Sequence, residues 1–243
     1  MRLERLADAQ SVAARGADLV GEVLRAKPEA VLVLPAGATP VPLYAELVRR
    51  ARAGALELAR AQLFQLDELV GVGAEDARGF HAFLRVHLLQ PLGLERRFHG
   101  LDGLAREPAA EIERHRRALL ALGAPDLVLL GLGKNGHVAF NEPGAEPDCA
   151  ARVVELDAST RAELGPAFDG AAPARGLTLG LAEIGASRRI ALLVTGAAKS
   201  AILARVRRGP PSSACPATLL ARHADLVVLA DEAAAGHAAH AGS

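Results

Sequence analysis

A short apolar run that ends in a glycine-rich turn constrains the fold of this chain more than any other stretch. Residues 127–130 read Leu-Val-Leu-Leu, a run short enough to be a buried strand. Gly131, Gly133 and Gly136 follow it directly. Open α/β sheets bind their ligands just beyond the carboxyl ends of their parallel strands, where such turns lie. The stretch 126–144 therefore predicts a strand end that carries a binding site.

The same turn brings three polar side chains of different chemistry close together in the sequence. Asn135, His137 and Glu142 supply an amide, an imidazole and a carboxylate within eight residues. Histidine titrates near neutral pH, and a nearby carboxylate can orient its ring and tune its pKa. A lone histidine in a polar loop is more often a structural residue, but this one lies among glycines at a strand end. The turn is therefore a candidate catalytic site.

Strand-like and helix-like segments alternate along the rest of the chain. Apolar runs typical of buried strands occur at residues 30–34, 61–66, 152–156, 189–195 and 225–230. Patterns typical of helices occur at residues 7–26, 41–53, 80–89, 107–122 and 200–207. Residues 93–103 fit neither pattern, so we expect them to be irregular. The alternation predicts a mostly parallel, Rossmann-like sheet with helices on both faces.

Length, charge and cysteine content narrow the function classes. A chain of 243 residues suits one large domain, residues 1–243, with residues 233–243 expected to fray. Basic and acidic residues number 28 each, so net charge indicates neither a nucleic-acid nor a membrane partner. The sequence shows no signal peptide or transmembrane run, and Cys149 and Cys215 lack zinc-type spacing. We expect a cytoplasmic protein without a metal site; whether it forms a homo-oligomer stays open.

Three further strand ends carry groups suited to anion binding or proton transfer. Residues 35–40, PAGATP, lie between a strand and a helix, where backbone N–H groups and the helix dipole can bind an anion. An ordinary βα turn has the same composition. Asp67 and Glu68 follow another predicted strand, where adjacent carboxylates are usually solvated or capping residues. Lys199 opens a helix after a strand, where its ammonium is either solvated or placed beside a phosphate.

Several of these motifs resemble one family. Residues 131–144, GLGKNGHVAFNEPG, resemble the signature of glucosamine-6-phosphate deaminases, G-x-G-x-[DN]-G-H-x-x-F-N-E-P. The related 6-phosphogluconolactonases have a similar G-x-D-G-H but lack F-N-E-P. The turn at 35–40 resembles the P-T-G-[GS]-T-P turn of the deaminases, and residues 67–71 resemble their D-E-[YL]-V-G. The resemblance covers residues 30–232 and implies a single-domain, three-layer α/β/α fold.

The resemblance implies a role for each catalytic candidate. His137 would handle the proton of ring opening at the sugar O5, and Asn135 and Glu142 would orient and tune its imidazole. Many family members have Asp at position 135. An amide can fix the ring tautomer by a hydrogen bond but supplies no charge to stabilise the imidazolium. Asp67 would move a proton between C2 and C1 of the open-chain sugar. No metal or organic cofactor is needed, because the substrate's own carbonyl acidifies the C2 proton.

The resemblance also implies which residues hold the sugar phosphate, namely Gly37, Ala38, Thr39 and Lys199. Ala38 replaces a residue whose side chain the family often uses, so only backbone contacts would remain there. The family's phosphate-binding arginine lies on a mobile lid of the kind that often gates turnover. Pro166 stands at that position in this chain. We expect Arg161, or else Arg175, to substitute for the missing arginine.

The reaction implied by the resemblance belongs to amino-sugar catabolism. The chain would be a hydrolase or isomerase that converts glucosamine 6-phosphate to fructose 6-phosphate and ammonium. One alternative is a 6-phosphogluconolactonase, against which the F-N-E-P of residues 140–143 argues. Another is an isomerase/deaminase of a different hexosamine phosphate, which the altered lid would permit. A non-catalytic sugar-phosphate sensor is the third, although a sensor has no need of the base Asp67.

Overall fold

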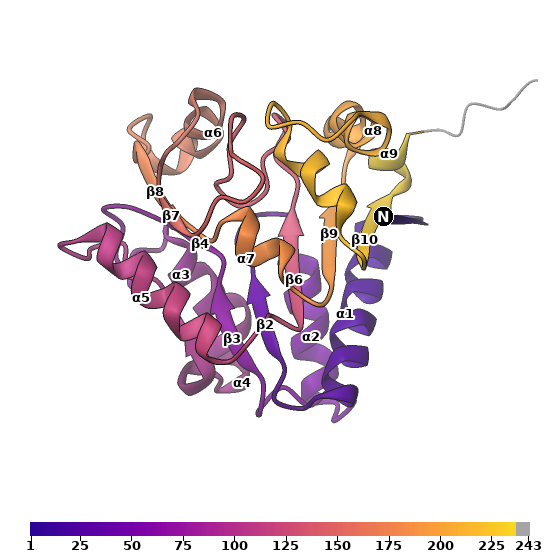
Figure 1. Cartoon of the computed structure of the whole chain (residues 1–243). Helices are drawn as coiled ribbons and strands as arrows, with labels where there is room; N and C mark the ends of the chain where they lie inside the picture. Colours follow the sequence, from indigo (N-terminus) through magenta and orange to yellow (C-terminus); the bar gives the residue numbers. More distant parts are fainter. Residues whose placement is uncertain (237–243) are drawn as a thin grey trace, which may run out of the picture.

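The computed structural model describes residues 1–236 and is built on a seven-stranded sheet. In spatial order its strands are β1 (Arg2–Leu6), β10 (Leu226–Asp231), β9 (Ile190–Val194), β6 (Leu127–Gly131), β2 (Val31–Leu34), β3 (Gln62–Gln65) and β5 (Phe98–His99). Every pair of neighbouring strands is parallel. The carboxyl ends of all these strands therefore lie at one edge of the sheet (Figure 1).

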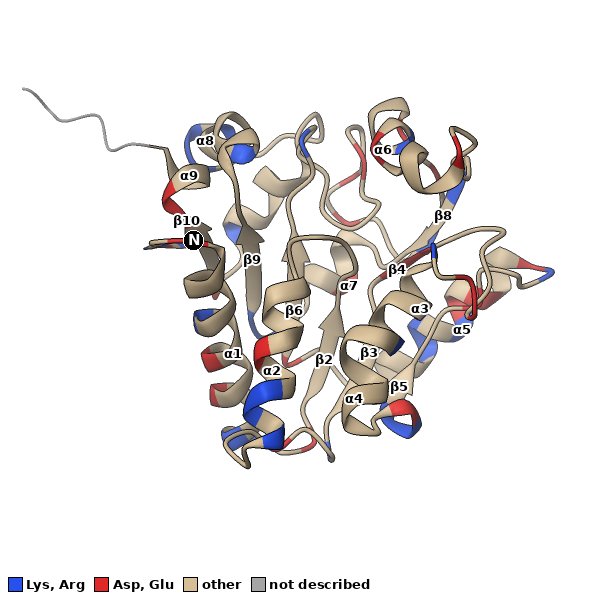
Figure 2. Cartoon of the chain, turned by 180° about the vertical axis from the view of Figure 1, so that it is seen from behind, with Lys and Arg blue, Asp and Glu red and all other residues tan. Residues whose placement is uncertain are grey.

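Helices cover both faces of this sheet, because successive residues of a strand point to opposite sides. Leu32 enters an apolar cluster covered by α1 (Ala9–Ala26) and α2 (Val41–Arg52). The adjacent Val33 enters a second cluster, covered by α5 (Pro108–Ala121), α7 (Leu181–Gly185) and α8 (Ser200–Arg208). Figure 2 shows α1 and α2 in front of the sheet, with basic and acidic residues on both helices. The predicted α/β/α arrangement with a parallel sheet is confirmed.

A second sheet of three antiparallel strands lies beside the first. It consists of β4 (Asp67–Leu69), β8 (Arg175–Thr178) and β7 (Arg152–Glu155), in that order. The sequence places Asp67 and Glu68 directly after a predicted strand but does not predict that they begin another one. Asp67 opens β4 and pairs with Thr178. The partner strand is far away in the sequence, so no local pattern indicates the pairing.

Three other segments differ from the sequence-based expectations. β1 is not predicted, because it alternates polar residues and pairs with β10 alone. β5 and the 3₁₀ helix η2 (Glu95–Arg97) lie within the stretch expected to be irregular. The helix predicted at 80–89 is divided into α3 (Phe80–Leu84) and the π-helical η1 (Arg85–Leu89), and α4 (Gln90–Leu92) extends it. Gly93, at φ 65°, ends α4 in the left-handed region that favours glycine.

The prediction for the C-terminus is corrected in part. Residues 233–243 are predicted to fray, but α9 (Glu232–Ala235) includes the first of them, and Ala234 is buried. Asp231 caps this helix by accepting a hydrogen bond from the backbone N–H of Ala234 at 2.7 Å. Residues 237–243 lie outside the described part of the chain.

The parallel sheet brings the loops after β2, β3, β6 and β9 to the same edge. A short helix, α6 (Ala158–Leu164), follows β7 and lies beyond that edge (Figure 1). It continues into the 3₁₀ helix η3 (Gly165–Phe168). Within residues 1–236, no helix combines the length and the apolar character needed to cross a membrane.

Candidate active site

A cavity of about 390 Å³ opens at the carboxyl edge of the parallel sheet. The loops after β2, β3, β6 and β9 form it together with α6. Six of the residues that the sequence nominates line it: Gly37, Ala38, Thr39, Asp67, His137 and Lys199. Asn135 and Glu142 contact His137, whereas Arg161 lies elsewhere. The structure thus brings together most of a site predicted from distant loops.

The glycine-rich turn seats the imidazole of His137. The N–H of Gly133 donates to the carbonyl oxygen of His137 at 3.0 Å, and the N–H of His137 donates to Oδ1 of Asn135 at 3.0 Å. A Cβ at position 133 would lie 2.5 Å from the imidazole ring atoms. Only glycine leaves room for the ring. Ala139, which also lines the cavity, has φ 51°, a left-handed conformation that costs a non-glycine residue about 1 kcal/mol or more.

Glu142 faces the imidazole from the far end of the same loop. Its Oε2 lies 3.3 Å from Nδ1 of His137 and accepts a hydrogen bond from Nδ2 of Asn135 at 2.9 Å. Burial by itself raises the pKa of Glu142, but the interactions with His137, Thr160 and Asn135 together outweigh burial, so the pKa is lowered. An ionised acceptor at this place keeps the proton of the neutral imidazole on Nδ1. Nε2, which has no hydrogen-bond partner within residues 1–236, is then free to accept a proton.

Asp67 is a buried carboxyl group at the cavity wall. The residue is 7% exposed, and its carboxyl group has no hydrogen-bond partner among the described residues. Burial raises its pKa from 3.8 to about 8, and the negative charge of Glu68 adds to the rise. In the empty cavity at neutral pH, Asp67 is therefore mostly protonated. A group whose pKa lies near the working pH is suited to exchanging protons with a substrate.

Glu68 is fully buried beside Asp67 but is satisfied by hydrogen bonds. Its carboxylate accepts from four donors at 2.7 to 3.1 Å: the N–H groups of Leu69, Phe80 and His81 and the side-chain amide of Gln65. Burial raises the pKa of Glu68, and these hydrogen bonds oppose the rise. The residue ties the start of α3 to β4, which fixes the strand that carries Asp67.

A second part of the cavity carries groups suited to an anion. The turn at residues 36–40 leads into α2, and its Gly37 has φ 110°. The hydroxyl of Tyr44 donates to the carbonyl oxygen of Pro35 at 2.5 Å, which ties α2 to the start of this turn. Lys199 ends the short 3₁₀ helix η4 (Ala197–Lys199) and is partly buried. Burial lowers its pKa, although Glu163 raises it.

Three polar side chains of the cavity are not nominated by the sequence, namely Lys134, Thr160 and Glu163. Lys134 lies in the glycine-rich turn, and its place just beyond a strand end is a signal that could have found it. Nζ of Lys134 lies 3.3 Å from the carboxylate of Glu163. The hydroxyl of Thr160 lies 3.3 Å from Nδ1 of His137. The resemblance places a lid in this part of the chain, but nothing local in the sequence shows which face of α6 meets the cavity.

Arg161 does not reach this cavity. It is exposed and lines a separate hollow together with Pro166. Residues three and four apart share a helix face, so Thr160 and Glu163 face the cavity while Arg161 points away. The position of Arg161 therefore does not fit the predicted contact with phosphate. Lys134 and Lys199 are the lysines that line the cavity instead.

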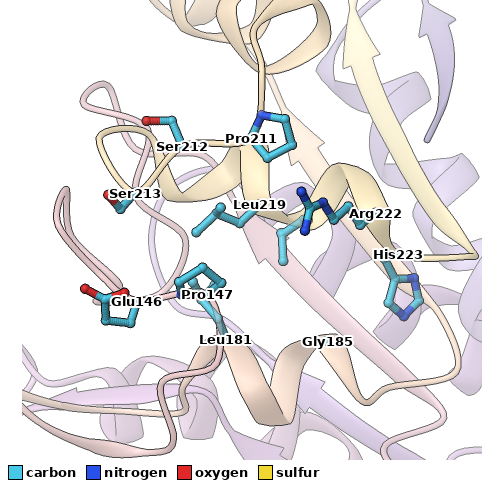
Figure 3. Close-up of a pocket in the computed structure, with 11 residues that line it drawn as sticks. Glu146, Pro147, Leu181, Gly185, Pro211, Ser212, Ser213, Leu219, Arg222 and His223 are labelled. Carbon is cyan, nitrogen blue, oxygen red and sulfur yellow. The ribbon is translucent and has the colours of Figure 1, made fainter.

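A larger hollow, of about 530 Å³, lies away from these residues (Figure 3). Pro147, Leu219 and Arg222 are among its lining residues, and no residue nominated by the sequence is. Its histidine, His223, already uses both ring nitrogens, at 2.8 Å to the carbonyl of Ser187 and at 3.1 Å to the N–H of Asp225. Chemistry rather than size thus marks the smaller cavity as the candidate active site.

Comparison with known sequences agrees with this assignment. Residues 4–228 match the family described as glucosamine-6-phosphate isomerases/6-phosphogluconolactonase. A glucosamine-6-phosphate deaminase of Streptomyces coelicolor is 38% identical over 223 residues, covering 90% of this chain and 85% of its own length. One of Rhodopirellula baltica is 38% identical over 238 residues, covering 97% and 95%. Since these relatives are deaminases, they support the isomerase and deaminase class and not the expected alternative of a hydrolase.

Solved structures give the same result. The structure of a monomeric glucosamine-6-phosphate deaminase matches with a TM-score of 0.94 at 31% identity, covering 97% of this chain and 99% of its own. A 6-phosphogluconolactonase from Trypanosoma brucei matches with a TM-score of 0.78 at 22% identity, which shows a shared fold. Because the match runs through both sheets and every cavity loop, the chain belongs to the glucosamine-6-phosphate isomerase and 6-phosphogluconolactonase family, whose members act on sugar phosphates.

Proposed function

We propose that this protein is a glucosamine-6-phosphate deaminase, which isomerises glucosamine 6-phosphate and releases ammonium to give fructose 6-phosphate. The observation that carries the proposal is the joint placement around one cavity of a buried carboxyl group, an imidazole–carboxylate pair and two lysines. Relatives at 36–38% identity that bear this name support it.

Ring opening is the first step that the site can perform. It moves a proton from the C1 hydroxyl of the sugar to the ring oxygen. His137 accepts this proton at Nε2, because the carboxylate of Glu142 holds the other ring proton at Nδ1. The same carboxylate stabilises the imidazolium that forms for the time of the transfer. Asn135 supports both partners by hydrogen bonds to Glu142 and to the backbone of His137.

Asp67 then acts on the open-chain sugar. The aldehyde at C1 acidifies the C2–H bond, and the carboxylate takes that proton and returns it to C1. The substrate's ammonium group passes one proton to the oxygen at C1, which becomes a hydroxyl, and the nitrogen at C2 is left as a protonated imine. Water then adds to C2, and ammonium leaves as the C2 ketone forms. The empty cavity holds Asp67 mostly protonated at neutral pH, but the ammonium of a bound amino sugar favours the ionised form. This dependence on a cationic substrate favours an amino sugar over a neutral one.

The anion end of the cavity is suited to the phosphate of the substrate. Lys134 and Lys199 supply positive charge, and the backbone of residues 37–39 supplies N–H groups next to the start of α2. All of these groups come from one chain. We therefore propose that a single chain is a complete catalytic unit, a proposal that the monomeric relative supports. A cytoplasmic location stays a prediction.

A second candidate is an isomerase/deaminase of another hexosamine phosphate. It is favoured by Pro166, which stands where the resemblance places a phosphate-binding arginine. The two candidates share the catalytic steps and differ in the sugar, so a substrate comparison separates them.

The decisive experiment measures ammonia release from glucosamine 6-phosphate, with coupled detection of fructose 6-phosphate. The variant His137→Ala is assayed in parallel, as are other hexosamine phosphates and 6-phosphogluconolactone. Equal amounts of ammonia and fructose 6-phosphate, lost in the variant, are expected. Turnover of a different hexosamine phosphate alone would support the second candidate. Hydrolysis of the lactone without ammonia release would overturn both.

A further inference from the structure

The cavity face of α6 touches both ends of the candidate site. Its Thr160 lies beside the imidazole of His137, and its Glu163 forms an ion pair with Lys134 at 3.3 Å. Leu164, the next residue of the helix, also lines the cavity. A single short helix therefore contributes a hydroxyl to the proton-transfer end and a carboxylate to the anion end.

The carboxylate of Glu163 has no role in the proposed reaction. The proton steps use His137 and Asp67, and a fixed negative charge at the anion end opposes the binding of a phosphate. In the absence of a ligand, however, Glu163 affects the two lysines of the cavity. Lys134 lowers the pKa of Lys199 by repulsion, and Glu163 raises it by attraction. Glu163 thus balances two ammonium groups that would otherwise repel each other.

We propose that Glu163 is an internal counter-ion of the anion end, which occupies Lys134 in the empty site and is displaced by the phosphate of the substrate. The inference rests on the proposed function for the identity of that phosphate. Side-chain exposure is 58% for Lys134 and 40% for Glu163, so their ion pair is solvated and weak. A phosphate dianion offers more charge and more acceptor oxygens than a carboxylate, and it can take over the lysine.

The exchange makes Glu163 a specificity-determining residue. An anion must outcompete a carboxylate that is already tethered next to Lys134, so dianionic phosphates gain access while weaker monoanions do not. The tether also lowers the affinity for the correct substrate and for the product phosphate. Removing the charge should therefore tighten phosphate binding, which is the opposite of the effect expected for an ordinary binding residue.

The test measures binding of inorganic phosphate by calorimetry at pH 8. Glu163→Gln should bind phosphate about three- to tenfold more tightly than the parent protein, the size expected for loss of one solvated ion pair and its repulsion. Glu155→Gln is the matched control, because Glu155 is exposed on β7, lies outside the cavity and has no ion-pair partner among the described residues. It should change the affinity by less than twofold.

A double-mutant cycle with Lys134→Gln identifies the partner. In the Lys134→Gln background the effect of Glu163→Gln should fall to less than half, because the lysine that the carboxylate occupied is gone. With glucosamine 6-phosphate, Glu163→Gln should lower KM by a factor similar to the gain in phosphate affinity and leave kcat at or below the parent value. A merely structural disturbance would lower kcat without tightening the binding of any anion.

Equal or weaker phosphate binding by Glu163→Gln would overturn the inference, as would an equal gain in Glu155→Gln. The binding measurement does not depend on turnover. If the parent protein releases no ammonia but Glu163→Gln still binds phosphate more tightly, the proposed function is rejected and the counter-ion role of Glu163 is retained. Ammonia release that depends on His137, without any effect of Glu163 on phosphate binding, would reject the counter-ion alone.

Discussion

Replacing Asp67 by Asn should stabilise the protein increasingly as the pH rises. Asp67 is 7% exposed, and burial raises its pKa from 3.8 to about 8. A carboxyl group whose pKa is higher in the folded state than in the unfolded state penalises folding wherever only the unfolded state ionises. The penalty is absent below pH 3.8, grows between pH 3.8 and about 8, and is constant above that range.

The two pKa values set the size of this effect. One pKa unit corresponds to about 1.36 kcal/mol. Ionisation of the unfolded chain alone therefore costs the folded state about 2 kcal/mol at pH 5 and about 4 kcal/mol at pH 7. Asn has nearly the same shape as Asp and carries no charge at either pH. The variant should thus gain about 1.4 kcal/mol over the parent for each pH unit between 5 and 7.

The assay is urea unfolding of both proteins at pH 5, 6, 7 and 8. Asp148→Asn serves as the control, because Asp148 is exposed and has no hydrogen-bond or ion-pair partner within residues 1–236. Its stability relative to the parent should not change with pH. A constant difference between Asp67→Asn and the parent at all four pH values would refute the argument. So would an equal slope in the control. Asp67→Asn should also release no ammonia, since an amide cannot take the C2 proton.

Three further predictions concern the proposed reaction. kcat/KM should rise with pH up to an apparent pKa near 8, which is the pKa of Asp67 in the free enzyme. kcat should level off at a lower pH, because the ammonium of the bound substrate favours the carboxylate of Asp67. Superimposable pH profiles of kcat and kcat/KM would contradict this. Gly133→Ala places a Cβ 2.5 Å from the imidazole and should lower kcat by about a hundredfold with an unchanged circular dichroism spectrum; near-parental kcat would show that the ring tolerates it. Arg161→Ala should change KM less than about twofold, because Arg161 lies outside the cavity, whereas Lys134→Gln should raise KM about tenfold. A larger effect of Arg161→Ala than of Lys134→Gln would restore the sequence-based assignment of Arg161 to the phosphate.

Local signals were sufficient for the central strands β10, β9, β6, β2 and β3 of the parallel sheet and for the loops at their carboxyl ends, but not for the edge strands β1 and β5. The buried strands are short apolar runs, and parallel pairing then brings Gly37, Asp67, His137 and Lys199 to one place although they are far apart in the chain. Glu142 lies on the same loop as His137, so the chain itself keeps this pair close. Each of these positions follows from a pattern within about ten residues plus the handedness and parallel order of the fold.

The remaining features depend on contacts between distant segments. β4 exists only because Asp67 pairs with Thr178, and the second sheet in turn positions α6. Which face of α6 meets the cavity decides that Glu163 enters it and Arg161 does not. The seven residues of α6 are too few to carry an amphipathic pattern that would show this. The raised pKa of Asp67 likewise arises from burial that only the assembled structure creates.

The pairing of β1 with β10 has a consequence for how the chain folds as it is made. Arg2 lies opposite Val227, and the guanidinium of Arg5 donates to the carbonyl of Gly236 at 3.2 Å. Because synthesis runs from β1 towards β10, β1 has no partner in this sheet until β10 has left the ribosome, roughly 10 to 45 s later at ordinary rates of synthesis. During that interval β6 and β2 can already pair, while β6 lacks β9 at its other edge. The cavity acquires Lys199 only after β9 has been made and has paired with β6, so the anion end of the cavity is not complete before that stage.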